Sequence, residues 1–156
     1  MKRTKELMIF VLVLMLINYG NFASGGELDE ACGFAYKKLK SVSSAQVSQT
    51  MGTFTYQGRQ YQGCITKLIG DRTKIADAQY PGPLFYPFKS SPGYRAGWRA
   101  DIESEADGPD GTAFRMIRAN TFCFVEGKWN GGDDGDPGYV PLKRYEVTVS
   151  CTTLKH

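Results

Sequence analysis

Five aspartates in two glycine-rich stretches are the side chains of this 156-residue chain best suited to metal chemistry. They lie in Asp107–Gly111 and Gly132–Asp136, where glycines let the backbone curl. Calcium takes six to eight oxygens from carboxylates, carbonyls and water on such flexible backbone. We therefore predict a possible calcium site whose ligands would be Asp107, Asp110, Asp133, Asp134 and Asp136. Neither stretch has the EF-hand spacing, and the alternative is that aspartate and glycine only form turns here.

Carboxylates also suggest hydrolysis, because no basic residue lies between Arg99 and Arg115 while five acids do. Two opposed carboxylates can cleave a glycoside when one of them is an acid with a raised pKa. The only histidine is His156, the last residue, so histidine-dependent triads and the usual zinc hydrolysis lack their central group. We expect a protein that is not an enzyme, with a small carboxylate-dependent glycan hydrolase as an alternative.

A segment rich in proline and aromatic residues, 79–97, is the candidate binding surface. Its proline density excludes a central strand, and long irregular segments of compact domains are often functional. Rigid aromatic rings bury contact area at a small cost in entropy. We expect Tyr86, Tyr94 and the adjoining Trp98 to be exposed for binding. The alternative is that these rings pack over one end of a small sheet.

Four cysteines, Cys32, Cys64, Cys123 and Cys151, point to an oxidising compartment. An even number in an exported chain indicates two disulfides, and three pairings are possible. We favour Cys32–Cys64 and Cys123–Cys151, because each joins neighbouring elements. A metal site is the weaker interpretation, since zinc ligands usually come in close pairs.

The first 25 residues have the order of a secretory signal peptide: basic residues, an apolar run over Leu7–Ile17, then small residues. The run is too short to span a membrane, which needs about 20 residues. We expect cleavage after Gly25, a single domain over residues 26–156, and a periplasmic or extracellular location. The formal net charge of +3 then falls to +1, which does not favour nucleic-acid binding.

Charge is divided unevenly along the chain. Residues 31–100 carry ten basic and two acidic side chains, whereas residues 101–156 carry six and ten. If folding brings these halves together, they neutralise each other. If it does not, the basic half attracts an acidic partner.

The spacing of apolar residues along the chain predicts the helix and strands that position these side chains. Apolar residues recur every three or four positions only over Glu27–Ser44, which predicts a helix, and Ser41–Thr50 reads as a polar connection. Alternation predicts strands in five further segments: 53–56, 60–69, 113–118, 121–126 and 145–152. The predicted fold is α+β, with an N-terminal helix packed on an antiparallel sheet of about five to seven strands or a partly open barrel.

One hairpin carries a resemblance. The residues Tyr56–Cys64, with their turn glycine, aromatic residues and cysteine, resemble a strand-turn-strand of small exported bacterial β-barrel proteins, some of which are lysozyme inhibitors. The resemblance implies an inhibitor or binding module.

The function we expect is therefore an exported, non-catalytic binding or inhibitor-like protein that recognises another protein or a cell-envelope glycan. A calcium-stabilised interaction domain and the glycan hydrolase are the alternatives.

Overall fold

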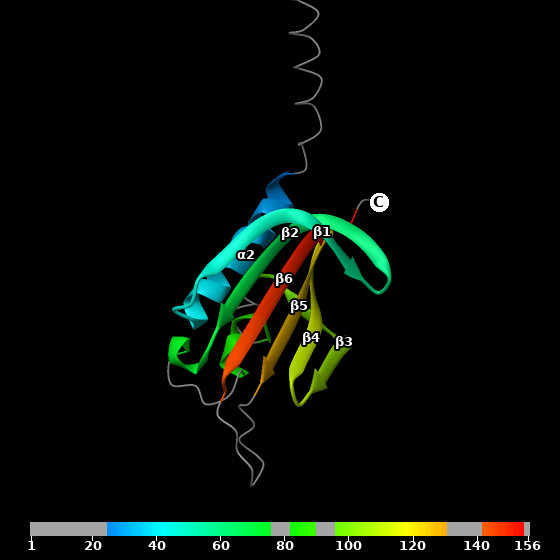
Figure 1. The fold of residues 1–156 in the computed structure, drawn as a ribbon. Coiled ribbons are helices and arrows are strands. Elements are labelled where there is room, and N and C mark those ends of the chain that lie inside the picture. The colour runs from blue at the N-terminus through cyan, green and yellow to red at the C-terminus, as the bar shows by residue number, and fades with distance from the viewer. Residues whose placement is uncertain (1–24, 76–81, 90–95, 131–141, 155–156) are drawn as a thin grey trace, which may run out of the picture.

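A computed structural model describes residues 25–75, 82–89, 96–130 and 142–154, and these form one helix packed on one antiparallel sheet (Figure 1). The long helix is α2 (Gly25–Val42). Six strands form the sheet in the order β1-β2-β6-β5-β4-β3. Their bounds are β1 (Val47–Tyr56), β2 (Arg59–Gly70), β3 (Arg99–Gly108), β4 (Gly111–Arg118), β5 (Thr121–Asn130) and β6 (Arg144–Thr153). The predicted fold class is confirmed.

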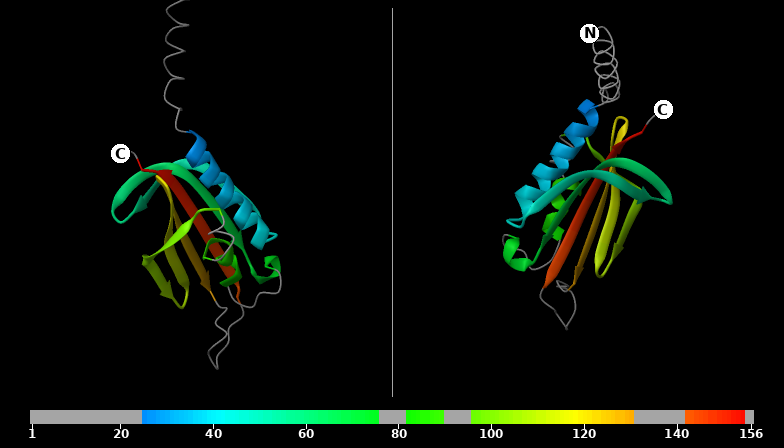
Figure 2. Two further views of the ribbon diagram at one scale, coloured as in Figure 1. Left: turned by 180° about the vertical axis from the view of Figure 1, so that it is seen from behind. Right: turned by 45° about the horizontal axis from the view of Figure 1, so that its top comes forward.

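Helix α2 forms where the apolar period predicted it, and it lies across one face of the sheet (Figure 2). Its buried side contains Ala31, Ala35 and Leu39, spaced four residues apart on one helical face. Glu27 in the first turn and Lys40 in the last suit the helix dipole.

Both predicted disulfides are present: one joins the helix to the sheet, and the other lies within the sheet. Cys32–Cys64 fastens α2 to β2, and Cys123–Cys151 links directly opposed residues of β5 and β6. Since all four cysteines are used, the chain has no free thiol. The disulfides indicate an oxidising environment.

The second layer over the same sheet face comes from the proline-rich segment, through η2 (Gly82–Leu84) and the short helix α3 (Tyr86–Lys89). Phe85 lies so close to Gly127 of β5 that a Cβ there would come within 2.1 Å of its ring. Phe88 packs edge-on against Phe34 of α2. This segment therefore covers the part of the sheet that α2 does not reach.

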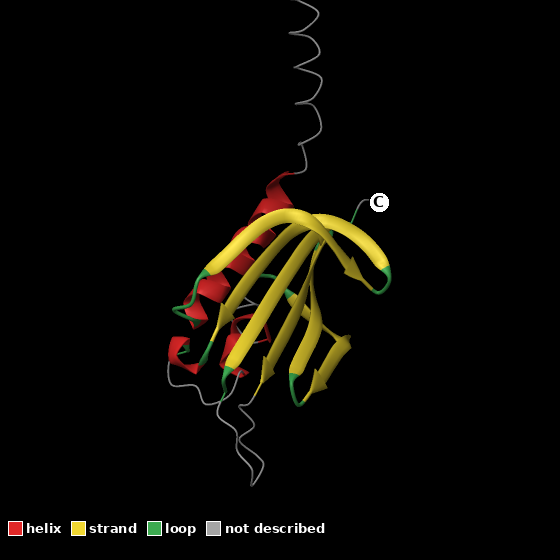
Figure 3. Ribbon diagram, in the orientation of Figure 1, coloured by secondary structure: helices red, strands yellow, loops and turns green. Residues whose placement is uncertain are grey.

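Strands β1 and β2 form a hairpin that arches over the face of the sheet opposite α2 (Figure 3). The turn Gln57-Gly58 has positive φ at both residues, the geometry of a type I′ hairpin turn. Phe54, Tyr56 and Tyr61 near its tip contact Phe122 of β5, although β2 and β6 separate β1 from β5 in the sheet. The contact is possible only because the hairpin bends.

One prediction about secondary structure was wrong, and one strand was not predicted. The connection expected over Ser41–Thr50 ends early, because β1 begins at Val47 rather than at Thr53. The acidic stretch, to which the sequence assigned no element, forms the strand β3. Both are edge strands, largely exposed, so neither shows the apolar alternation by which half-buried strands are recognised.

Candidate functional site

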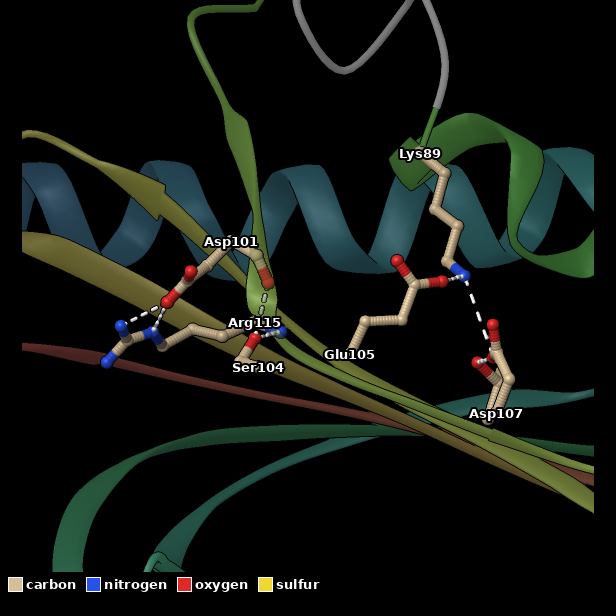
Figure 4. Close-up of polar contacts among 7 residues, drawn as sticks. Lys89, Asp101, Ser104, Glu105, Asp107 and Arg115 are labelled. Carbon is tan, nitrogen blue, oxygen red and sulfur yellow. Dashed lines mark hydrogen bonds and ion pairs between the residues drawn. The ribbon is translucent and has the colours of Figure 1, made fainter.

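The acidic strand β3 is neutralised by cations from two neighbouring elements (Figure 4). The Arg115 guanidinium of β4 donates from both Nε and Nη2 to one carboxylate oxygen of Asp101, with Nε at 3.0 Å. The Lys89 ammonium of α3 donates to Glu105 and lies 3.8 Å from Asp107. Three of the acids expected to be solvated are therefore ion-paired.

A bulge interrupts the middle of β3. The register with β4 shifts between Asp101 and Ala106. The Ser104 hydroxyl accepts the backbone N–H of Arg115 at 2.8 Å and donates to the Asp101 carbonyl at 2.7 Å. Because the bulge and the charges both disturb the outer side of β3, this edge is poorly suited to accept another strand.

The predicted calcium ligands are divided between described and undescribed residues. Asp107 lies near the end of β3 and Asp110 in the β3–β4 turn, and the Thr112 hydroxyl donates to Asp107. This hydrogen bond holds the pKa of Asp107 below its ordinary value. Asp133, Asp134 and Asp136 lie outside the described residues. Within residues 25–75, 82–89, 96–130 and 142–154, no three metal-binding side chains come together.

The lowered pKa of Asp107 also bears on hydrolysis. A carboxyl that donates a proton to a leaving group needs a raised pKa. Hydrogen bonding to the ionised form does the reverse at Asp107. The lowered pKa of Asp107 therefore favours the anion beside Lys89 and does not suit a proton donor.

The three aromatic residues of the predicted binding surface differ in their exposure to solvent. Tyr86 is 51% exposed. Trp98 is 1% exposed, so the prediction that its ring faces solvent was wrong. Its ring stacks on Phe34 of α2, with the Arg118 guanidinium 5.1 Å from the ring centre. Tyr94 lies outside the described residues.

A surface that was not predicted from the sequence is the outer edge of β1, which pairs with β2 alone among the strands that the structure describes. Four consecutive residues, Ser48–Met51, are exposed, and Met51 is 63% exposed. Nothing between Val47 and Tyr56 is charged, and none of these residues is proline. Natural sheets usually protect an edge with charge, proline, a bulge or brevity, and β1 has none of these over ten residues. The lack of charge and proline in β1 would have indicated an unprotected edge if its first half had been predicted as a strand.

A basic hollow of about 460 Å³ lies at the start of β1. Lys40 from the end of α2 and Lys74 from η1 (Arg72–Lys74) line it together with serine and threonine residues. One of those serines, Ser43, is hydrogen-bonded at 2.6 Å to Tyr145, whose pKa is raised by burial. No acidic side chain lines the hollow.

A second hollow of about 580 Å³ lies beside the other edge of the sheet. Arg99, Arg115 and Arg118 line it, together with Asp101 and Glu103. Two of these arginines are already engaged, Arg115 by Asp101 and Arg118 by Glu30 of α2. Its mixed charge favours no single class of ligand.

Comparisons with protein-family models, with curated proteins and with solved structures found no match to this chain. Among the described helices, none is long and apolar enough to cross a membrane. The class defined here is a disulfide-linked α+β domain with one protected and one unprotected sheet edge.

Proposed function

We propose that this protein is an exported, non-catalytic binding protein that recognises another protein. The observation that carries the proposal is the ten-residue β1 edge, uncharged and largely exposed. An unpaired strand edge offers main-chain donors and acceptors to an extended polypeptide, which can add a strand to the sheet.

The same observation favours a protein over an envelope glycan as the partner. A glycan has no regular row of amide groups to match a strand edge, whereas a peptide in extended conformation does. The exposed aromatic residue Tyr86 on α3 is an additional candidate contact, which is tested separately.

Export agrees with this function. Two disulfides that use every cysteine suit an oxidising compartment, periplasmic or extracellular, where binding proteins and inhibitors act. The N-terminal signal peptide predicted from the sequence would supply the route.

The test is partner capture by the purified, oxidised protein and two variants at one position. Met51→Pro removes a main-chain N–H from β1, whereas Met51→Ala removes only the side chain. We expect Met51→Pro to lower capture of specific partners by about tenfold or more, and Met51→Ala to keep most of it. Circular dichroism and thermal midpoint would check that both variants fold.

A partner set unchanged by Met51→Pro would contradict recognition through β1. Tyr86→Ala, run in parallel, reports on the aromatic residue. If only Tyr86→Ala abolished capture, the binding function would stand but its surface would be α3.

A further inference from the structure

We infer that the β1 edge binds an extended, acidic segment of the partner as an added strand, and this inference rests on the binding function proposed above. Three features carry it: the direction of the β1 main-chain groups, the place where the strand bends, and the sign of the surrounding charge.

The hairpin turn fixes which β1 groups point away from the sheet. Tyr56 and Arg59 flank the two turn residues Gln57 and Gly58, so they form a hydrogen-bonded pair of the ladder. Such pairs alternate with non-hydrogen-bonded pairs in an antiparallel ladder, and the β1–β2 register runs without interruption to Val47. The N–H and C=O groups of Val47, Gln49 and Met51 therefore point toward the open edge.

The bend in the hairpin limits how much of β1 a partner can follow. Gly52 and Gly63 are opposite each other in the register, and beyond them the hairpin arches toward Phe122. The segment before the bend is Val47–Met51, and Ser48, Gln49, Thr50 and Met51 are exposed there. The docked strand would thus be short, about five residues.

The charge around this segment selects the partner's composition. Between Gly25 and Ile75 the chain has four acidic residues, Glu27, Asp29, Glu30 and Asp71, and seven basic residues: Lys37, Lys38, Lys40, Arg59, Lys67, Arg72 and Lys74. The Cys32–Cys64 disulfide places the acidic start of α2 nearest the Met51 end of the segment, because Cys64 is the cross-strand partner of Met51. Lys67 lies opposite Ser48 in the register, and its only ion pair in the described part of the chain is with Glu146, at 3.7 Å. Lys40 and Lys74 line the hollow at the start of β1.

The fold preserves this charge difference instead of cancelling it. Strands β1 and β2 lie at one side of the sheet, while the acids of β3 lie at the other, neutralised by their own arginine and lysine. An acidic strand on β1 would find the cations Lys40, Lys67 and Lys74 near the Val47 end of the segment.

A second copy of this chain fits the edge less well. Two copies would pair antiparallel about a two-fold axis over the same short segment, Val47–Met51. Each copy brings the same excess of basic residues to this edge, which disfavours self-pairing.

The experiment is selection from three pools of synthetic peptides on the immobilised, oxidised full chain. Each pool holds extended peptides of about eight residues, randomised at alternate positions, with paired glutamates, glutamines or lysines at fixed sites. We expect the glutamate pool to be enriched at least about tenfold over the lysine pool, with weaker binding at high salt.

Two matched comparisons assign the binding to β1 and to its charge. Two N-methylated versions of the best peptide are compared, one methylated at the odd-numbered residues and the other at the even-numbered residues. Only one version should lose binding, because a docked strand turns the N–H groups of alternate residues toward β1. Lys40→Glu with Lys74→Glu should remove the preference for glutamate. Lys128→Glu with Lys143→Glu makes the same change in net charge on β5 and before β6, and should leave the preference intact.

Equal enrichment of the three pools, or loss of binding in both N-methylated versions or in neither, would overturn the inference. So would a lack of enrichment in every pool, or dimerisation in sedimentation runs that Met51→Pro abolishes. Partner capture that still depends on Met51 would then leave the proposed function standing, so the two failures are distinguishable.

Discussion

Strands β1 and β3 are the two edges of one sheet, and each exposes a row of main-chain groups that has no neighbour within that sheet. Strand β3 carries four acids in ten residues, a bulge at Ser104 and ion pairs to α3 and β4. Strand β1 carries no charge and has an unbroken register. The same domain therefore protects one edge and leaves the other uncharged, and the proposed binding function rests on this difference.

The first prediction tests the bend of the β1–β2 hairpin, which shortens the open edge of β1. A Cβ at Gly63 would lie 1.9 Å from the Cys151 carbonyl oxygen, so Gly63→Ala forces backbone apart between β2 and β6. We expect a loss of about 3 kcal/mol in the free energy of unfolding, measured by denaturant titration. This is the largest effect predicted for a single methyl group in the hairpin.

Gly52→Ala is the matched control, because Gly52 is the cross-strand partner of Gly63. Its Cβ would meet only the Ile65 Cδ1 at 3.3 Å, the end of a side chain that can move. A loss below about 1 kcal/mol is expected. Equal losses for the two variants would show that contact with β6 does not set the shape of the arch.

A second variant makes β3 resemble β1. Glu103→Thr, Glu105→Thr and Asp107→Thr together remove three of the acids that protect this edge, and leave Lys89 without its two carboxylates. We expect self-association to rise above that of the wild type in light scattering and sedimentation. The cost in folding stability should be about 1 kcal/mol or less, since these ion pairs lie at the surface with all three side chains partly exposed.

The control for charge alone replaces three exposed acids away from β3, as Glu27→Thr, Asp29→Thr and Asp71→Thr. It has the same net charge as the β3 variant and should remain as dispersed as the wild type. Association of both variants would attribute the effect to net charge, and the contrast between the two edges would lose its physical basis.

The central elements of the fold could be predicted from the sequence, whereas its two edge strands could not be predicted in full. The helix, the central strands and both disulfides were predicted, because half-buried elements show their period and because each cysteine pair joins neighbouring elements. The start of β1 and all of β3 were missed, because edge strands exposed on both faces have no such period. The burial of Trp98 depends on Phe34, 64 positions earlier, and no local pattern reports that contact.

The smallest predicted effect compares one carboxyl group from each side of the sheet. Asp107 beside β3 accepts from the Thr112 hydroxyl, and Asp71 after β2 accepts from the Thr73 hydroxyl and from its backbone N–H. Each hydrogen bond stabilises the ionised form, so the pKa of both groups lies below the ordinary value of 3.8. A lowered pKa in the folded state favours folding above that value, and the contribution is lost as the pH falls through the folded-state pKa.

Thr112→Val should therefore raise the pKa of Asp107 toward 3.8 and leave that of Asp71 unchanged, as followed by NMR titration of the carboxyl carbons. Thr73→Val should raise the pKa of Asp71 only in part, because the backbone N–H at 2.8 Å remains. The stability change at neutral pH should be slight for Asp107, whose side chain is 60% exposed and screened by solvent. If Thr112→Val left the pKa of Asp107 low, the neighbouring Glu105 and Lys89 side chains rather than the Thr112 hydroxyl would be the cause, and β4 would not set the charge of the protected edge.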